Sequence, residues 1–262
     1  MVAILSGKRA LVGGGSKGIG KACALELARL GADVTVVARN EGMLKEVVAE
    51  LAGAGGSNHC YIVADFADPD ALQTKVADHV EKVGPITILV NNTGGPPGGP
   101  ILDATPDQLL QAISNHLICN QLIVQTLLPG MKSQGYGRIV NIISTSVIAP
   151  IKGLGVSNAT RGAVANWGRT LAGELAPLGI TVNNVLPGFT DTARLQSLFS
   201  AKAERTSKTL EEVQRNAIES IPMGRLGGAE EIGAVVAFLA TPAASYVNGV
   251  NLPVDGGRTA VQ

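Results

Sequence analysis

Short segments rich in Val and Ile alternate with amphipathic segments of helical length through most of the chain, and this alternation constrains the fold most strongly. The candidate strands are residues 9–13, 33–38, 59–64, 86–92, 137–144, 180–187 and 250–257. The candidate helices are residues 18–31, 41–53, 69–83, 106–134, 155–177 and 228–240. Strands that are apolar on both faces are typical of parallel sheets covered on both sides, joined by right-handed crossovers. The sequence therefore predicts an α/β fold, a doubly wound parallel sheet of about seven strands with helices on both faces.

Two segments interrupt this alternation, and neither divides the chain into separate domains. The Gly- and Pro-rich segment 93–100 follows the fourth strand, and the polar segment 193–217 follows the sixth. Ligands of doubly wound sheets bind beyond the carboxyl ends of the strands, which both segments leave. We therefore expect a single domain, residues 1–262, in which loop 93–100 and a flap near 190–220 border a substrate pocket. The alternative for both segments is an ordinary surface loop.

The composition excludes several classes of function. The formal net charge is zero, with 21 basic and 21 acidic residues, and aromatic residues make up only 3%, so nothing indicates a nucleic-acid partner. No segment approaches the ~20 apolar residues of a membrane span, and the apolar start of the chain is too short for a secretory signal. The three cysteines have neither paired nor metal-ligand spacing. We expect a cytoplasmic protein with free thiols, without a metal site or a membrane partner.

The segment VGGGSKGIG joins the first candidate strand to the first candidate helix. The strand ends at Gly13 and the helix begins near Gly18. In such a turn, backbone amides and the helix N-terminus face a pyrophosphate, and a side chain larger than hydrogen would block its approach. The sequence therefore predicts a dinucleotide-binding turn whose cofactor contacts are Gly14, Ser16, Lys17, Gly18, Ile19 and Gly20.

The end of the second strand indicates which dinucleotide binds. An Asp or Glu near this place binds the free ribose 2′-hydroxyl of NAD(H), whereas a cation accommodates the 2′-phosphate of NADP(H). This chain has Ala38, Arg39 and Asn40 there, and Lys17 in the glycine-rich turn. Two cations and no acid favour NADP(H) over NAD(H). For either cation alone, the alternative is a solvated surface charge.

These features and several motifs farther along resemble the short-chain dehydrogenase/reductase family over nearly the whole chain. The glycine-rich turn matches the family's Gly-x-x-x-Gly-x-Gly motif, and NNTG (91–94) is similar to its Asn-Asn-Ala-Gly motif. The resemblance implies a seven-stranded Rossmann-type sheet, a homo-oligomer (tetramer or dimer), and hydride transfer between a nicotinamide and a carbonyl or alcohol substrate. It also implies cofactor contacts at Asp65, Phe66, Asn91, Asn92, Gly94, Arg161, Pro187, Gly188 and Thr192.

The resemblance fails at the family's catalytic tetrad of Asn, Ser, Tyr and Lys. Ser144 falls at the catalytic serine, but the Tyr position thirteen residues on is Ser157, and the Lys position four further is Arg161. The Asn position falls on His116. Asn115 is adjacent, but one helical step turns a side chain by ~100°, so Asn115 replaces the missing Asn only if the helix shifts.

These replacements change the proton chemistry that the resemblance implies. A tyrosine phenol with a pKa near ~10 protonates the substrate oxygen, whereas the aliphatic hydroxyl of Ser157 is a far weaker acid. Arg161 stays cationic and can bind ribose hydroxyls, although its planar fork imposes a different geometry from Lys. His116, with a reference pKa of ~6.5, is a candidate proton donor, and a neutral, hydrogen-bonded structural histidine is the alternative. Ser144 needs no low pKa to bind the substrate oxygen.

Two main hypotheses for the function follow. The first is an NADP(H)-dependent oxidoreductase with an atypical proton-relay site, acting on a small-molecule carbonyl or alcohol. The second is a catalytically silent NADP(H)-binding protein of the same fold, with a sensor or assembly role. Dehydration or isomerisation in the same pocket is a third, less favoured hypothesis. General acid–base catalysis typically contributes about 10²–10⁴-fold, so the altered tetrad predicts a damaged or rerouted enzyme without compelling a dead one.

Overall fold

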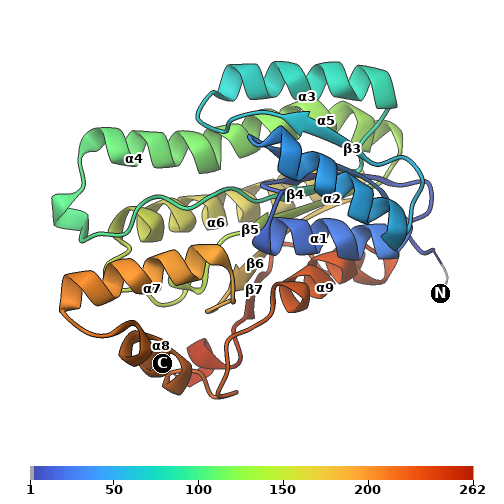
Figure 1. The fold of residues 1–262 in the computed structure, drawn as a ribbon. Coiled ribbons are helices and arrows are strands. Elements are labelled where there is room, and N and C mark those ends of the chain that lie inside the picture. Colours follow the sequence, from blue (N-terminus) through green and yellow to red (C-terminus); the bar gives the residue numbers. More distant parts are fainter. Residues whose placement is uncertain (1–2, 262) are drawn as a thin grey trace.

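The computed structural model describes residues 3–261 and contains one seven-stranded parallel sheet (Figure 1). The strands are β1 (Arg9–Gly13), β2 (Asp33–Ala38), β3 (Cys60–Val63), β4 (Ile88–Asn91), β5 (Gly137–Ile142), β6 (Ile180–Pro187) and β7 (Asn251–Val254). Their order is β3-β2-β1-β4-β5-β6-β7. The order reverses between β1 and β4, and this reversal opens the crevice in which doubly wound folds bind ligands. The predicted fold class is confirmed.

Helices cover both faces of the sheet. They are α1 (Gly18–Arg29), α2 (Glu41–Ala54), α3 (Pro69–Val83), α4 (Pro106–Ile113), α5 (Cys119–Ser133), α6 (Gly155–Leu175), α7 (Ala193–Thr206), α8 (Leu210–Glu219) and α9 (Ala229–Leu239). α1, α2 and α9 pack on one face, and α3, α5 and α6 pack on the other (Figure 1). Within residues 3–261, no helix is both long enough and apolar enough to cross a membrane.

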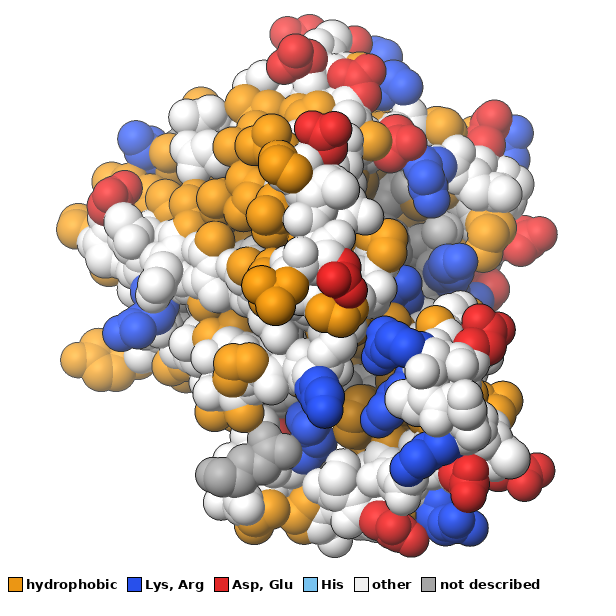
Figure 2. All heavy atoms as spheres, turned by 90° about the vertical axis from the view of Figure 1, so that its left-hand side faces the viewer, with side chains coloured by type: hydrophobic (Ala, Val, Ile, Leu, Met, Phe, Trp, Pro, Cys, Tyr) orange, Lys and Arg blue, Asp and Glu red, His pale blue; other side chains and the backbone are white. Residues whose placement is uncertain are grey.

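The polar segment after β6 folds into the two helices α7 and α8. Leu195, Phe199 and Ala203 share one face of α7, because four-residue spacing places side chains above one another on a helix. They pack against Val213 and Ala217 of α8, in a cluster separate from the cores on the sheet. α4 and α7 follow the carboxyl ends of β4 and β6, and both lie on the side of the molecule that Figure 2 shows.

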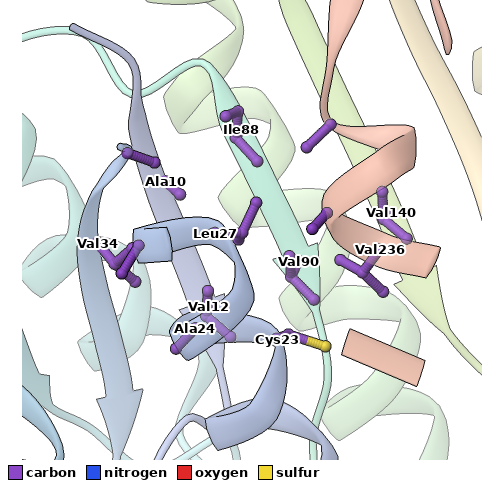
Figure 3. Close-up of a cluster of buried hydrophobic side chains, with 14 of the residues drawn as sticks. Ala10, Val12, Cys23, Ala24, Leu27, Val34, Ile88, Val90, Val140 and Val236 are labelled. Carbon is purple, nitrogen blue, oxygen red and sulfur yellow. The ribbon is translucent and has the colours of Figure 1, made fainter. Parts of the chain in front are cut away.

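Alternate residues of each strand fill two separate cores. In β1, Val12 lies in the cluster beneath α1 and α9, and Leu11 lies in the cluster beneath α3 and α5. Neither side chain is exposed. Figure 3 shows the first cluster, in which Cys23, Leu27 and Val236 approach the sheet from their helices. Burial on both faces explains why the strands are apolar throughout and can be found in the sequence.

A row of asparagine side chains crosses four neighbouring strands. Asn91, Asn141, Asn184 and Asn251 are aligned in register on β4, β5, β6 and β7. The Asn91 amide donates to the Asn141 side-chain oxygen at 2.8 Å, and the Asn141 amide donates to that of Asn184 at 2.9 Å. The Asn184 amide in turn donates to the side-chain oxygen of Asn251 at 2.8 Å. Because slippage by one residue would break these buried bonds, the row specifies the register of the strands that carry the candidate site.

The helix predicted over residues 106–134 is not a uniform α-helix. A π-helical turn over Ser114–Ile118 joins α4 to α5, and this turn contains His116. A π-helical turn bonds residue i to residue i+5, and single turns of this kind are frequent at functional sites. The side chains after the turn therefore point in directions that a regular helix would not give them.

Candidate active site

The glycine-rich turn lies at the carboxyl end of β1 and is shaped by close approaches of the backbone. Gly14 and Gly18 have φ angles of +57° and +55°, in the left-handed region that favours glycine. A Cβ atom on Gly20 would lie 2.3 Å from the Gly14 carbonyl oxygen. Asn92 braces the turn, because its Nδ2 donates to the Gly13 carbonyl at 3.0 Å. The turn is therefore held open in a form that only glycine permits.

The N-terminus of α1 adjoins this turn and suits an anion. Among the residues that the structure describes, no side chain caps this helix, and its first turn contains no acid. Lys17 occupies the N-cap position in an extended conformation and is exposed. Ser16 and Ile19 flank Lys17 and Gly18 and are half-buried. Free amides at a helix N-terminus bind phosphate, so the residues present fit the diphosphate of a dinucleotide.

Two cations lie near the end of β2. The Arg39 side chain is 77% exposed, and its Nη1 lies 3.8 Å from Oδ2 of Asp65. Asn40 caps α2, because its side-chain oxygen accepts a hydrogen bond from the Met43 amide at 3.0 Å. Arg39 and Lys17 therefore have guanidinium and ammonium groups at the surface, whereas the side-chain oxygen of Asn40 is already engaged.

The residues around the end of β4 divide between the surface and the core. Asn91 is 3% exposed because it belongs to the asparagine row, whereas Asn92 points to the glycine-rich turn. Side chains alternate along a strand, so these neighbours point in opposite directions. The Phe66 ring is buried, and its Cζ atom would lie 3.0 Å from a Cβ atom on Gly13. Gly94, by contrast, is exposed.

The end of β6 connects the sheet to the segment α7–α8. Pro187 is buried, and Gly188 approaches Asp255 so closely that an added Cβ would lie 2.6 Å from the Cβ of Asp255. Thr192 caps α7, accepting a hydrogen bond from the Leu195 amide at 3.3 Å. Its methyl group would lie 3.4 Å from a Cβ on Gly18, so the start of α7 lies against the glycine-rich turn.

Ser144 and Ser157 lie on elements that pack against each other. Ser144 follows β5 with an extended backbone, and its Oγ accepts a hydrogen bond from the Ser146 amide at 3.1 Å. Accepting this bond leaves the Ser144 hydroxyl proton free for a ligand. Ser157 is half-buried in the first turns of α6, the helix that packs on the short turn after Ser144.

Arg161 lies one helical turn after Ser157 and on the same face of α6. Its side chain is nearly buried, at 9% exposure, and its Nη1 donates to the Ile142 carbonyl at 3.1 Å. Burial lowers the pKa of Arg161 to about 10, and the nearby charge of Arg194 acts in the same direction. The guanidinium remains a cation at neutral pH, close to the end of β5 from which Ser144 follows.

The π-helical turn places His116 beside Arg161. His116 is 2% exposed, and burial, together with the charge of Arg161, lowers its pKa to about 2. A hydrogen bond to the backbone of Gly94 opposes this shift. Asn115 points elsewhere: the end of its side chain lies 2.9 Å from the Phe66 carbonyl, to which its amide nitrogen donates when the amide is turned toward that oxygen. At neutral pH the His116 imidazole is therefore uncharged.

All three tyrosines of the chain lie outside this region. The hydroxyl of Tyr61 donates to Glu41 at 3.0 Å, and that of Tyr136 donates to the Ala240 carbonyl. Tyr246 is fully exposed, in the segment before β7. Ser157 and Arg161 therefore have no phenol beside them that could protonate a substrate oxygen.

The structure adds one residue that the sequence did not single out. Arg194, in the first turn of α7, donates from Nη2 to the Pro96 carbonyl in loop 93–100. An added Cβ on Gly95 would lie 3.5 Å from Nη2 of Arg194 and 3.7 Å from Nη2 of Arg161. The only signal in the sequence was the position of this arginine two residues after Thr192, at the start of the expected flap.

Comparisons with known proteins identify the family of this chain. A family model described as Enoyl-(Acyl carrier protein) reductase matches residues 14–259. The chain is 36% identical over 256 residues to the 3-oxoacyl-[acyl-carrier-protein] reductase FabG of Pseudomonas aeruginosa, covering 97% of this chain and 98% of that one. It is 36% identical over 263 residues to the short-chain reductase protein NovJ of Streptomyces niveus, covering 98% and 96%.

Solved structures show the same similarity in three dimensions. The L-sorbose reductase of Gluconobacter frateurii, complexed with NADPH and L-sorbose, superposes with a TM-score of 0.91 at 28% identity, covering 98% of each chain. The NADPH-dependent reductase YwfH, involved in bacilysin biosynthesis, gives a TM-score of 0.90 at 26% identity, covering 97% and 98%. Because both the family model and these relatives span nearly the whole chain, the protein belongs to the short-chain dehydrogenase/reductase family of oxidoreductases.

Proposed function

We propose that this protein is an NADP(H)-dependent oxidoreductase that interconverts a small-molecule carbonyl and alcohol through an atypical proton-relay site. The observation that carries the proposal is the glycine-rich turn, whose closely approached backbone and uncapped helix α1 fit a dinucleotide diphosphate. Two relatives of the same fold have NADPH in their descriptions, and this supports the choice of cofactor.

Lys17 and Arg39 would hold the 2′-phosphate that distinguishes NADP(H) from NAD(H). Both are exposed near the carboxyl edge of the sheet, and β2 ends at Ala38 without an acid at that point. The carboxylate of Asp65 lies near Arg39 and competes for its charge, but at 3.8 Å and with both groups exposed the competition is weak. When bound, the nicotinamide supplies or accepts the hydride.

We infer that Ser144 and Arg161 together replace the catalytic tyrosine as stabilisers of the substrate oxygen. Ser144 retains a hydroxyl proton to donate, and Arg161 provides a nearly buried positive charge close to the end of β5. Preorganised donors of this kind stabilise negative charge on oxygen without being strong acids. The alkoxide that forms on hydride transfer then takes a proton from water and releases hydroxide to the solvent, because an alkoxide is about as strong a base as hydroxide.

His116 is assigned a structural role in this scheme. Its imidazole is neutral over the physiological range because its pKa is lowered to about 2, and it bonds to the backbone of Gly94. A neutral imidazole in that position shapes the wall beside Arg161, where the family resemblance places an Asn. Of the two alternatives for His116, this favours the structural one over the proton donor.

The decisive experiment introduces the Tyr and Lys of the family's catalytic tetrad. The double variant Ser157→Tyr/Arg161→Lys is expected to raise kcat on a carbonyl panel with NADPH by about 10²–10⁴-fold at pH 7, the usual contribution of general acid catalysis. The control Ser157→Phe/Arg161→Lys fills the same volume without a hydroxyl and should not show this gain. If wild type oxidises NADPH faster than Ser144→Ala does in the presence of a carbonyl substrate, the result supports the proposed enzyme.

Tight NADPH binding without turnover on any carbonyl would instead support the second function, a catalytically silent cofactor-binding protein. The absence of a tyrosine beside Ser157 and Arg161 is the observation that favours this alternative.

We also propose a cytoplasmic homo-oligomer, a dimer or tetramer. Hydrophobic side chains gather around the height of α4 in Figure 2. Ile101 and Leu102, shortly before α4, and Leu110, within α4, are 48%, 95% and 67% exposed. Covering such a surface with another copy would remove apolar area from water. Light scattering of the purified protein measures the number of copies, and a monomer would contradict the proposal.

A further inference from the structure

Two arginine side chains, one from α6 and one from α7, approach loop 93–100 at the same glycine. Arg161 and Arg194 both bring Nη2 to within 3.5–3.7 Å of the position that a Cβ on Gly95 would occupy. Arg161 comes from α6 and is nearly buried, whereas Arg194 crosses from α7 to the Pro96 carbonyl. The two guanidinium groups therefore both lie beside the Cβ position of one glycine.

These two positive charges are not balanced by acids. The ion pairs found within residues 3–261 include neither Arg161 nor Arg194. The hydrogen bonds that they do make go to backbone carbonyls, those of Ile142 and Pro96. Each guanidinium has five N–H donors, so most of the donors remain available. A nearly buried cation is rarely left without a counter-charge, and a second cation beside it adds repulsion.

A third arginine, Arg205, lies on the same face of α7 and contacts loop 150–154. Arg205 lies three helical turns after Arg194, and its Nη2 would be 2.7 Å from a Cβ on Gly153. Leu198 lies between them on this face, 3.8 Å from the corresponding position on Gly98. Lys and Arg side chains gather at the height of α7 in Figure 2. The surface of α7 that faces loops 93–100 and 150–154 is therefore basic.

From this convergence we propose that the substrate carries a carboxylate, which Arg161 and Arg194 bind together beside the reacting carbonyl. The inference rests on the proposed oxidoreductase function and specifies its substrate class. Planar guanidinium groups match the two oxygens of a carboxylate, so a pair of them holds such a group in one orientation. Arg161 bonds to the backbone two residues before Ser144, so the carboxylate would lie at the reaction end of the cleft.

The cofactor diphosphate is the alternative anion for Arg194 to bind. Thr192, two residues earlier, lies against Gly18 of the glycine-rich turn. The guanidinium of Arg194, however, bonds to Pro96 in the loop after β4, on the same loop that Arg161 approaches. The geometry thus favours the substrate, and measurements on Arg194 variants separate the two anions.

The test compares keto acids with their uncharged amides at saturating NADPH. Wild type should prefer each 2-, 3- or 4-oxo acid over the matching oxo amide, and Arg194→Gln should reduce the acid-to-amide ratio of kcat/KM by about 10- to 100-fold, mainly through KM. Arg194→Lys should restore part of that ratio because it keeps the charge. Arg215→Gln, at an exposed arginine near Glu219 on α8, is the matched control and should leave the ratio unchanged.

A binding measurement keeps this proposal separate from the proposed reaction. Calorimetry with oxalate, malonate and succinate on the NADPH complex needs no turnover, and at least one of these anions should bind wild type about tenfold more tightly than Arg194→Gln. Binding without turnover would support the anion site while counting against the reaction. Equal use of acids and amides, or a weaker NADPH affinity in Arg194→Gln with an unchanged ratio, would overturn the carboxylate proposal.

Discussion

Replacing His116 by Asn is expected to make the protein less sensitive to acid. His116 is 2% exposed beside Arg161, and its pKa is lowered from the ordinary value of 6.5 to about 2, first by burial and then by the charge of Arg161. The folded protein therefore keeps this imidazole neutral, whereas the unfolded chain protonates it below about pH 6.5. Below that pH the unfolded state binds one more proton, so the free energy of unfolding falls as the pH falls.

The size of the effect follows from the two pKa values. Each pH unit between the folded and unfolded pKa changes the free energy of unfolding by about 1.4 kcal/mol. Lowering the pH from 6.5 to 5 should therefore cost wild type about 2 kcal/mol through His116 alone. The loss would continue toward the folded pKa of about 2. His79, whose pKa is also lowered by burial, contributes equally to both proteins and cancels in the comparison.

Urea unfolding followed by circular dichroism measures this difference directly. Wild type should lose about 2 kcal/mol more of its free energy of unfolding between pH 7.5 and pH 5 than His116→Asn loses. Equal losses in the two proteins would mean that His116 titrates normally in the folded state. Such a result would refute the burial argument and return His116 to the list of proton donors.

Two further predictions concern the cofactor. Arg39→Ala should raise the Kd of NADPH by about tenfold and leave the Kd of NADH unchanged, because only NADPH carries the 2′-phosphate that Arg39 binds. Fluorescence titration measures both Kd values, and an equal rise in the two would contradict the assignment. Gly20→Ala should abolish NADPH binding, since its Cβ would lie 2.3 Å from the Gly14 carbonyl oxygen, whereas Gly162→Ala, with open space around its Cβ position, should retain it. Retained binding in Gly20→Ala would show that the turn can move aside.

The sheet could be predicted from the sequence because its strands are buried on both faces. The strands predicted at 9–13, 33–38 and 180–187 match β1, β2 and β6 residue for residue. Their apolar runs end at Gly, Arg or Gly, where the chain leaves the sheet. The other four strands, β3, β4, β5 and β7, are shorter than predicted, because the residues at the ends of the predicted segments do not pair with a neighbouring strand.

The interruption of the helix at 114–118 could not be predicted in the same way. The residues SNHLI have no distinctive helix-breaking signal, and the turn depends on contacts with distant parts of the chain. Asn115 contacts Phe66, and His116 contacts Gly94 and Arg161. Such contacts are tertiary, and they override local propensity.

Within the candidate site, spacing along one element predicts which side chains share a face. Ser157 and Arg161 share a face of α6, as their four-residue spacing requires. By contrast, the contact of Arg194 with Pro96 joins residues 98 positions apart, and no local pattern reveals it. Asn91 was expected at the cofactor because of its motif, but its side chain is directed into the asparagine row. The motif does not reveal the direction in which this side chain points.

The π-helical turn has a consequence for how this pocket can diversify. It holds five residues, Ser114–Ile118, and such turns arise where a helix accommodates one surplus residue. Deleting one residue there would let the helix close with ordinary spacing while α4 and α5 keep their orientation, because the π-helical turn absorbs the rotation of about 100° that the surplus residue adds. The group facing the buried guanidinium would then change from an imidazole to a neighbouring amide or alkyl chain. In this protein, an insertion or deletion of a single codon can therefore alter the polarity of the innermost wall as effectively as a substitution.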